Sequence, residues 1–327
     1  MSPSTWDECF TPGLLGRHHE RNHGYSILER KKLPEEKHED RISSLPNCLI
    51  GQILSYLPTK YSVSTCVLST RWKQLWTSIT SFDFDDELLS CSKNKRSVTS
   101  LQRSFTTFVS RVLLHHVSSV QRFRLKCTQS YDASLVNGWI AGTLLRNVRE
   151  LDLELTVLTD DSCMLPPDLF TCRTLVVLKL EVYGDHMIIE PASVSLPNLR
   201  ILHLASIKFV DDDSFNRFLS GCGRMLEELS MSGCPVSVIN IVAPKLTNLI
   251  MDDCRWPPRA FERKLVLDTP ALLRLTIHEY RERTVVNYLV ENLHRLIRAD
   301  ILLYGCDASS KALPDLLKGM SNVQFLH

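Results

Sequence analysis

The sequence predicts an α/β protein in which a small unit of three helices is followed by an irregular solenoid of parallel strands. Three observations lead to this prediction. Short apolar phrases at helical spacing occupy residues 40–86, a phrase of the form L-x-x-L-x-L recurs every 20 to 28 residues after residue 120, and Leu is abundant (51 residues) while Gly is scarce (12 residues). This composition favours repeated Leu-packed layers and disfavours glycine-rich phosphate loops.

Charge and cysteine content exclude several classes of protein. The 38 Lys and Arg balance 37 Asp and Glu, so no net field attracts the whole molecule to nucleic acid or to an anionic membrane. The 11 Cys are odd in number and never spaced C-x-x-C, which argues against a disulfide framework and a zinc finger. Residues 1–30 contain no continuous apolar segment of a secretory signal, and the uncharged stretch 42–59 contains two prolines that a membrane span rarely holds. We therefore expect a location in the nucleus and/or cytoplasm.

Four segments are expected along the chain. Residues 1–39 mix Gly, Pro, His and both signs of charge without an apolar period, which predicts a mobile leader. Residues 40–86 form the helical unit and residues 87–117 a linking helical segment. Residues 118–327 form about nine repeats, of which the last is truncated.

The first helix of the unit carries a wide apolar stripe. Its members fall at i, i+1, i+4, i+5 and i+8 and are Leu49, Ile50, Ile53, Leu54 and Leu57. Pro46 suits the start of this helix, and Pro58 ends it. A unit of about 40 residues buries little surface by itself. We therefore expect part of the stripe to bind a helix of a partner protein.

The linking segment is expected to contain one amphipathic helix. Its apolar residues fall at i, i+3, i+4, i+7 and i+8 and are Phe105, Phe108, Val109, Val112 and Leu113. This spacing predicts a helix whose apolar stripe packs on the elements that follow it.

The rest of the chain repeats one strand motif. Six strong copies begin at Val148, Leu175, Leu199, Leu226, Leu246 and Leu272, and three weaker copies begin at Val120, Leu296 and Met320. The intervals between copies lie in the range of leucine-rich repeats. Each unit has one strand and a return segment that cannot bury its Leu residues alone. Stacked units are therefore expected to share a core and to present a parallel sheet on the concave side, where proteins bind.

Alternation along the strands identifies the side chains that face the concave side. If the repeated Leu residues point inward, acidic residues outnumber basic ones among those that point outward. This composition either favours a basic segment of a target protein or is an ordinary solvated face. The expected target-binding residues are Asp152, Lys179, His203, Glu228, Ser230, Asp252, Arg274 and Thr276.

No motif for catalysis or metal binding is found. The sequence has no G-x-S-x-G, Walker, G-x-G-x-x-G or H-E-x-x-H phrase, and the 11 His have no metal-ligand spacing apart from adjacent pairs. We therefore assign no catalytic residue, no metal ligand and no cofactor. Basic and aromatic residues are not interleaved, so we expect no nucleic-acid partner.

The helical unit resembles the F-box of plant proteins. The matching positions, which follow one another without a gap, are Leu45-Pro46, Leu49-Ile50, Ile53-Leu54, Leu57-Pro58, Lys60, Val63, Thr65, Leu68-Ser69, Arg71-Trp72, Leu75-Trp76 and Asp83-Phe84-Asp85. The departures are mild, with Ile50 in place of the usual Leu, Tyr61 in place of a common acidic residue and Cys66 in place of a frequent Ser. Together with the repeats, residues 40–327 resemble the plant F-box/LRR-repeat family. Members of that family often continue into a C-terminal FBD segment, which this chain is expected to lack.

The resemblance implies a substrate receptor of an SCF-type E3 ubiquitin ligase that has no catalytic activity of its own. The F-box would dock on a Skp-type adaptor held by a cullin, the repeats would bind the target protein, and catalysis would belong to the RING and E2 subunits. The residues expected to contact the adaptor are Leu45, Pro46, Leu49, Ile50, Ile53, Leu57 and Pro58, whereas Trp72 and Trp76 are expected to pack internally.

Two alternatives remain open. One is a leucine-rich-repeat scaffold that joins no ligase, in which residues 40–86 only cap the solenoid. The other, which is weaker, is a small-molecule receptor similar to the hormone-binding F-box repeat proteins. It is weaker because no basic cluster marks a polyphosphate site and about nine units make an open arc.

Overall fold

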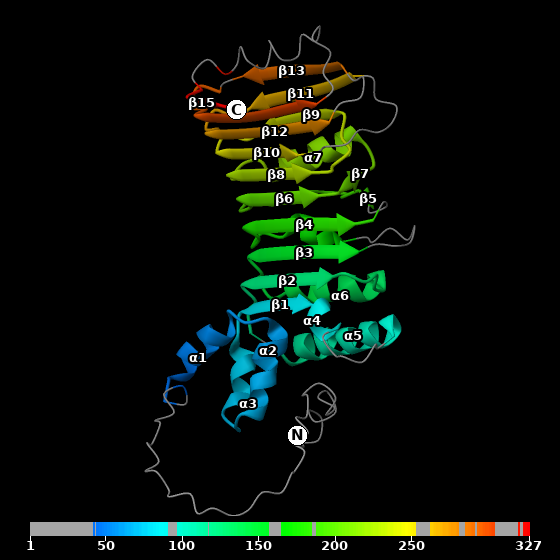
Figure 1. The fold of residues 1–327 in the computed structure, drawn as a ribbon, viewed down its shortest axis with the longest axis vertical. Coiled ribbons are helices and arrows are strands. Elements are labelled where there is room, and N and C mark those ends of the chain that lie inside the picture. The colour runs from blue at the N-terminus through cyan, green and yellow to red at the C-terminus, as the bar shows by residue number, and fades with distance from the viewer. Residues whose placement is uncertain are drawn as a thin grey trace, which may run out of the picture.

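A short group of helices continues directly into a long stack of parallel strands (Figure 1). The computed structural model describes residues 42, 44–90, 97–116, 118–156, 165–184, 188–252, 262–280, 285–291, 293–304, 320 and 323–327. The predicted leader, residues 1–39, lies outside these residues. The predicted fold class is confirmed, because three helical segments precede a sheet of parallel strands with the spacing of a leucine-rich-repeat solenoid.

Prolines set the start of the first two helices. Pro46 precedes α1 (Asn47–Leu54) and Pro58 precedes α2 (Thr59–Ser64), each at the N-cap position. The α2 helix continues into a 3-10 turn (Thr65–Val67), and the short α3 (Trp72–Leu75) continues into another (Trp76–Ser78). Proline cannot donate a backbone hydrogen bond, so it is tolerated where a helix begins but not inside one.

Ten parallel strands form the main sheet. In spatial order they are β1 (Ser81–Asp85), β2 (Arg122–Cys127), β3 (Glu150–Thr156), β4 (Val177–Tyr183), β6 (Ile201–Ala205), β8 (Glu228–Ser232), β10 (Asn248–Asp252), β12 (Arg274–Tyr280), β14 (Arg298–Tyr304) and β15 (Phe325–Leu326). Two smaller parallel sheets are made by β13 (Val285–Glu291), β11 (Glu262–Asp268) and β9 (Val238–Val242), and by β5 (Ile188–Ile189) and β7 (Lys208–Phe209).

Helices and 3-10 turns occupy the return segments of several repeats. They are α4 (Glu87–Ser90), α5 (Val98–His115), α6 (Ala133–Leu144), a 3-10 helix (Pro167–Thr171) and α7 (Asp212–Cys222). Asp132 and Asp211 cap α6 and α7, because each carboxylate accepts a hydrogen bond from a backbone N–H in the first turn. Among the described residues, no helix has both the length and the apolar character needed to cross a bilayer.

Aligned apolar side chains form one continuous core. The strands are paired in register, so that Leu151, Leu178 and Leu202 lie side by side on adjacent strands, and each is fully buried. The same cluster of buried residues contains Trp76 and Phe82 from the N-terminal unit. The helices and the repeats therefore share one core, and neither part closes its apolar surface without the other.

The sheet begins earlier than the repeat motif predicts. Strand β1 lies inside the segment 40–86 and pairs with β2, so that Phe82 lies beside Phe123 and Phe84 beside Leu125. The helix α5 lies between these two strands in sequence, and the interval is therefore longer than a leucine-rich repeat. The segment that resembles an F-box therefore contributes the first strand of the main sheet.

The register of the last repeat differs from the prediction. The sequence motif takes Val323 as the middle residue of the final copy, whereas Leu326 is paired with Ala299 and Phe325 with Arg298. Val323 takes the place of the first apolar residue instead, since its backbone N–H bonds to the carbonyl of Met320 in the way that Leu296 bonds to Leu293. Apolar residues three apart on both sides of Val323 made the two registers indistinguishable in the sequence.

A buried carboxylate joins the N-terminal unit to the repeats. Asp86, which directly follows β1, accepts hydrogen bonds from the backbone N–H and the hydroxyl of Thr128, the backbone N–H of Gln129 and the hydroxyl of Tyr131, at 2.8–3.1 Å. Its own N–H donates to the carbonyl of Lys126. Burial and the nearby Asp86 raise the pKa of Tyr131, which therefore stays a neutral donor. Four donors thus converge on one carboxyl group and hold the loop after β2.

A buried histidine lies at the same junction. His116 follows α5, is fully buried, and packs edge-on against Phe82 of β1 at a ring-centroid distance of 4.7 Å. Burial lowers its pKa below the usual 6.5, and the nearby Arg146 adds to this effect. The folded protein therefore holds His116 in its neutral form.

We expect this histidine to make the protein less stable in acid. As the pH falls through the ordinary histidine pKa of about 6.5, His116 takes up a proton in the unfolded chain but stays neutral in the folded chain. The contribution of neutral His116 to the free energy of unfolding is therefore complete above pH 6.5 and is lost as the pH falls toward the lower pKa of the folded state. Urea unfolding at neutral and mildly acidic pH should show a smaller loss of stability for His116→Phe, which keeps the ring against Phe82, than for the natural protein. Equal losses in the two proteins would contradict this assignment.

Candidate protein-interaction surfaces

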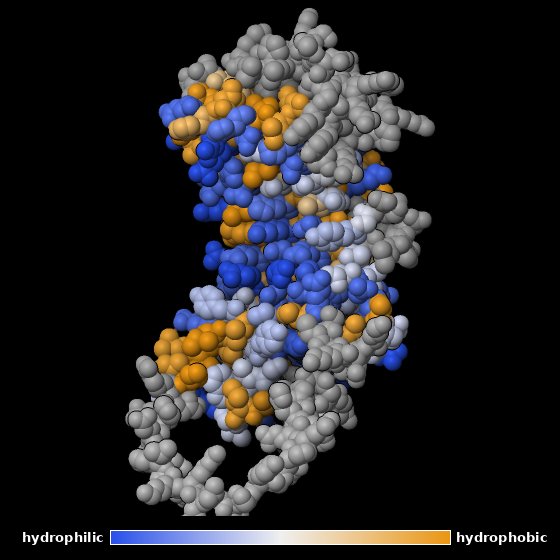
Figure 2. Space-filling view, in the orientation of Figure 1, coloured by the Kyte–Doolittle hydropathy of each residue, from blue (hydrophilic) through white to orange (hydrophobic). Residues whose placement is uncertain are grey.

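The wide apolar stripe of α1 is divided between the core and the surface. Ile50 and Leu54 are buried, whereas Leu49, Ile53 and Leu57 have 43, 49 and 37% of their surface exposed. The three exposed residues are spaced four apart and therefore lie along one side of the helix and the turn that follows it. Figure 2 shows hydrophobic side chains gathered over this helical part of the molecule. We call Leu49, Ile53 and Leu57 the outer stripe.

The other residues predicted to contact an adaptor have different positions. Pro46 is exposed at the start of α1, Pro58 is partly exposed at the start of α2, and Leu45 is half-buried against the core. Ile50, also among the expected contact residues, has a fully buried side chain. The helical period explains this difference, since positions 49 and 50 are about 100° apart and only one of them can face outward. The prediction that Trp72 and Trp76 pack internally is confirmed, as both are buried.

Arg71 holds the start of α1 in place. Its guanidinium donates to the Asn47 Oδ1 through Nε at 2.9 Å and through Nη2 at 2.7 Å, and Nη2 also donates to the carbonyl of Leu45. Arg71 is one of the positions at which the sequence resembles the plant F-box, but the resemblance gives it no role. These bonds connect the chain before α3 to the segment that carries Pro46 and the outer stripe.

The residues predicted to bind a target lie on one face of the main sheet. Asp152, Lys179, His203 and Ser230 occupy one row across adjacent strands, and the row continues to Thr276 on β12. Glu228 and Arg274 lie in the neighbouring row nearer the starts of the strands. Asp252 lies in the neighbouring row nearer their ends. The side chains alternate between buried and partly exposed along each strand, as the period of two predicts.

The prediction that this face is mainly acidic does not include the basic residues of β2. Arg124 bonds Asp83 at 3.0 Å and Glu154 at 2.6 Å, and Lys126 bonds Glu87 at 2.6 Å. These cations belong to the weak repeat that begins at Val120, from which none of the expected target-binding residues comes. The acids near β1–β3 are therefore largely paired within the protein.

Farther along the sheet, histidines lie next to carboxylates. His203 Nε2 lies 2.7 Å from a carboxylate oxygen of Glu228, and His278 lies between Asp252 and Asp300 at 3.6 and 3.8 Å. Burial raises the pKa of Asp152, while Lys179 and Arg124 oppose that effect. The middle of the face is polar, as Figure 2 shows over the central strands.

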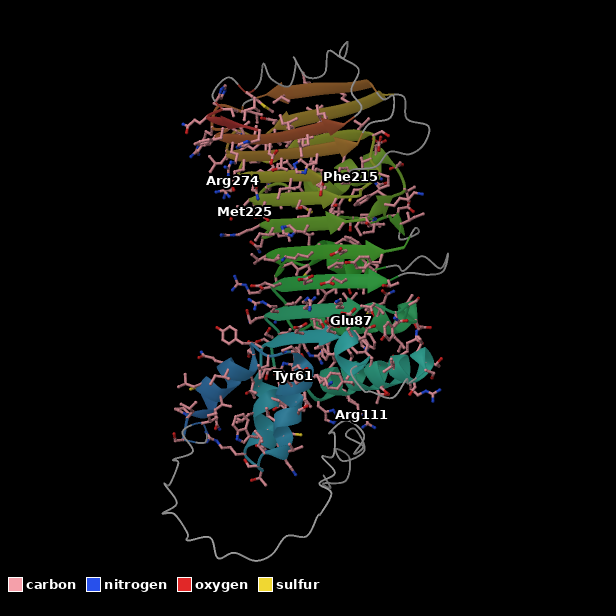
Figure 3. The ribbon with its side chains drawn as sticks, viewed as in Figure 1. Tyr61, Glu87, Arg111, Phe215, Met225 and Arg274 are labelled. Atoms are coloured by element: carbon pink, nitrogen blue, oxygen red, sulfur yellow. The ribbon has the colours of Figure 1, made fainter. Side chains whose placement is uncertain are left out.

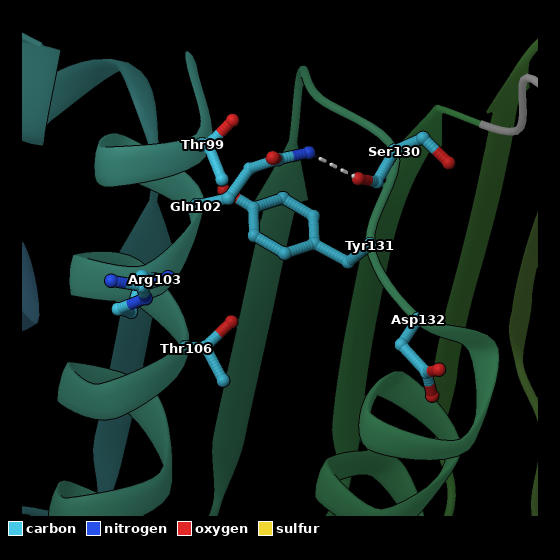
Figure 4. A pocket seen from close by; sticks show the side chains of 7 residues that line it. All are labelled: Thr99, Gln102, Arg103, Thr106, Ser130, Tyr131 and Asp132. Atoms are coloured by element: carbon cyan, nitrogen blue, oxygen red, sulfur yellow. Dashed lines mark hydrogen bonds between the residues drawn. The ribbon is translucent and has the colours of Figure 1, made fainter. Parts of the chain in front are cut away.

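Two recesses lie away from this face. A small polar one of about 230 Å³ is lined by α5 and the segment before α6, where Gln102 donates to the carbonyl of Ser130 at 2.7 Å (Figure 4). A larger apolar one of about 630 Å³ is lined mainly by residues 165–170 and 188–193. Within the described part of the chain, no group of three His, Cys, Asp or Glu side chains is arranged to hold a metal ion.

Comparison with known proteins matches both parts of the chain. Residues 42–84 match the model of the F-box domain, and residues 136–295 match the model described as the LRR repeats of the FBD-associated F-box protein At5g56370. Among the similar proteins of Arabidopsis thaliana are the F-box/LRR-repeat protein At3g59200, 35% identical over 88% of this chain and 58% of its own length, and the F-box/LRR-repeat protein At4g14103, 34% identical over 80% and 67%. The FBD-associated F-box protein At4g10400 is 30% identical over 83% of this chain and 63% of its own length. The chain thus spans 58 to 67% of the length of these three relatives.

Proposed function

Because the chain belongs to the F-box/LRR-repeat family, we propose that it is the substrate-recognition subunit of an SCF-type E3 ubiquitin ligase. An F-box implies binding to a Skp-type adaptor, and family membership suggests a receptor that is not itself catalytic. In this proposal the outer stripe binds the adaptor, which is held by a cullin, and the sheet of the solenoid binds the target protein.

The outer stripe is the observation that supports this proposal most strongly. Three large aliphatic side chains remain exposed in a row along α1 and the turn that follows it, although the same helix buries Ile50 and Leu54 in the core. An exposed apolar patch marks an interaction site, and a row of aliphatic residues at helical spacing fits an apolar groove or a partner helix. A unit that only capped the solenoid would have no use for this second apolar side.

The mechanism we propose is one of positioning. The N-terminal unit and the repeats share a core and a sheet, and Asp86 connects the end of β1 to the loop after β2. A target held on the repeats would therefore keep a defined position relative to the adaptor. This raises the effective concentration of target lysines near the ubiquitin-loaded E2 without any nucleophile from this chain.

Reconstituted ubiquitin transfer tests this proposal. The full chain is mixed with a Skp-type adaptor, a cullin with its RING subunit, an E1 and an E2, and conjugates are resolved from the reaction. We expect conjugates on the chain or on proteins bound to it that disappear when either the adaptor or the cullin is left out. A folded chain that forms no complex with the adaptor and cullin would contradict the proposal.

A further inference from the structure

Positive charge is concentrated along one edge of the main sheet. We call this the strand-entry edge. It comprises the turn residues that precede each strand and the first residue of the strand. Its exposed cations are Arg122, Arg149, Arg173, Arg200, Arg224, Lys245, Arg274, Arg295 and Arg298. Figure 3 labels Arg274 and Met225 at this edge, where the strands of Figure 1 begin. Cations outnumber acids along this edge, although the whole chain has a formal charge of only +1.

Among the residues that the structure describes, most of these cations have no acidic partner. Arg122 pairs with Glu150 at 2.6 Å and Arg200 pairs with Glu227 at 3.4 Å, while Glu228, the other acid of this edge, lies 2.7 Å from His203. The remaining cations of the edge form no ion pair with any residue that the structure describes. Bases on the concave side of β2, by contrast, are all paired with carboxylates.

Two of the unpaired cations are immediate neighbours. Arg274 and Arg298 are the first residues of β12 and β14 and are paired in the sheet register. Two neighbouring exposed cations raise the positive potential at this point of the edge, which favours an anionic partner. The guanidinium of Arg298 also lies over the ring of Phe325, 5.8 Å from its centroid, which restrains its position.

We propose that the strand-entry edge binds an extended acidic segment of the target protein. The identification of the partner as a target protein rests on the proposed function. Binding of acidic groups by this edge does not depend on it. The edge crosses eight adjacent strands from β2 to β14, which at about 4.8 Å per strand spans about 34 Å, or roughly ten residues of extended chain. Carboxylates along such a segment match the unpaired guanidinium and ammonium groups.

The chemistry of the edge favours an acidic polypeptide over a nucleic acid. Proteins that bind single strands combine cations with aromatic side chains on which bases stack. Among the described residues of the edge, aromatic surface is confined to Phe325 at its far end, which already lies against Arg298. The cations nearest that end, such as Arg274 and Arg298, are also far from α1, so the adaptor-binding region does not cover them (Figure 1).

The test measures binding of a labelled peptide of about twelve residues with alternating Glu and Ser to the full chain by fluorescence anisotropy. A Lys-Ser peptide and a single-stranded oligonucleotide of the same charge serve as comparisons. Arg274→Glu with Arg298→Glu should weaken binding of the Glu-Ser peptide by about tenfold or more, and added salt should weaken it further. The matched control is Arg103→Glu with Lys208→Glu, which makes the same change of charge at exposed positions on α5 and β7.

Each outcome decides the proposal. Selective binding of the Glu-Ser peptide that is lost in the edge variant and kept in the control variant supports it. No binding by the natural chain, equal loss in both variants, or tighter binding of the oligonucleotide would overturn it. Adaptor binding by the same variants is measured in parallel and should be unchanged. If adaptor binding fails while peptide binding holds, the proposed ligase function fails and the acidic-segment site stands.

Discussion

Replacing Leu49 with Asp and Ile53 with Lys is expected to weaken binding of a Skp-type adaptor by at least about 100-fold, because each aliphatic anchor of an interface can contribute 2 kcal/mol or more. Both side chains are partly exposed, so the substitutions leave the core intact. Asp in the first turn and Lys in the last turn of α1 also suit the helix dipole, which keeps the helix stable. Calorimetric titration of the adaptor with the purified chain gives the affinity, and thermal unfolding reports the fold.

The matched control places the same two charges on exposed aliphatic residues elsewhere. Leu114 and Leu145 are 76 and 82% exposed, near the ends of α5 and α6. Leu114→Asp with Leu145→Lys should leave adaptor affinity unchanged. If the control loses as much affinity as the outer-stripe variant, or if the outer-stripe variant binds normally, the assignment of Leu49 and Ile53 is wrong.

Asp86→Ala is expected to lower the free energy of unfolding by about 3 to 5 kcal/mol, because several buried hydrogen-bond donors lose their acceptor and each donor left unsatisfied costs about 1 to 3 kcal/mol. Two backbone N–H groups and two hydroxyl groups lose their shared acceptor in the loop after β2. Since β1 and this loop connect the N-terminal unit to the repeats, the loss should weaken the whole junction. Urea unfolding followed by tryptophan fluorescence measures the change.

Asp132→Ala is the matched control for this prediction. Its carboxylate also accepts hydrogen bonds from backbone N–H groups, but it is an exposed helix cap. Loss of this exposed cap should cost much less stability than loss of the buried acceptor Asp86. If the two variants lose equal stability, Asp86 is not the anchor that its bonds indicate.

The repeat architecture could be predicted because every unit repeats the same physical requirement. Buried positions three and five residues apart recur in each strand, and the structure places Leu175, Leu178 and Leu180 in the core as this pattern requires. Strand β1 does not follow the pattern, since its two phenylalanines are separated from the next unit by α5. The final register also escaped prediction, because the spacing of Met320, Val323 and Leu326 fits two alignments equally well.

The surfaces depended on information that a single sequence does not contain. A helical stripe of five apolar residues shows that an excess of apolar surface exists, but only the packing shows that Ile50 belongs to the core and Ile53 to the surface. Ion pairs between distant residues also cannot be predicted from a single sequence. Arg124 lies 30 residues before Glu154 and 41 after Asp83 in sequence, and only strand pairing brings the three together. The acids near β1–β3 therefore have basic partners that composition alone does not predict.

The most direct test of the central claim is a pull-down of the full chain with a panel of purified Skp-type adaptors, beside the variant Leu49→Asp with Ile53→Lys. Both substituted side chains are partly exposed, so the variant keeps the core that the helices share with the repeats. We predict that the full chain binds at least one adaptor and that the variant, shown to be folded by circular dichroism, is not retained by any of them. A folded full chain that binds no adaptor, or a variant that binds as well as the full chain, would contradict the claim that the helical unit is an adaptor-binding F-box.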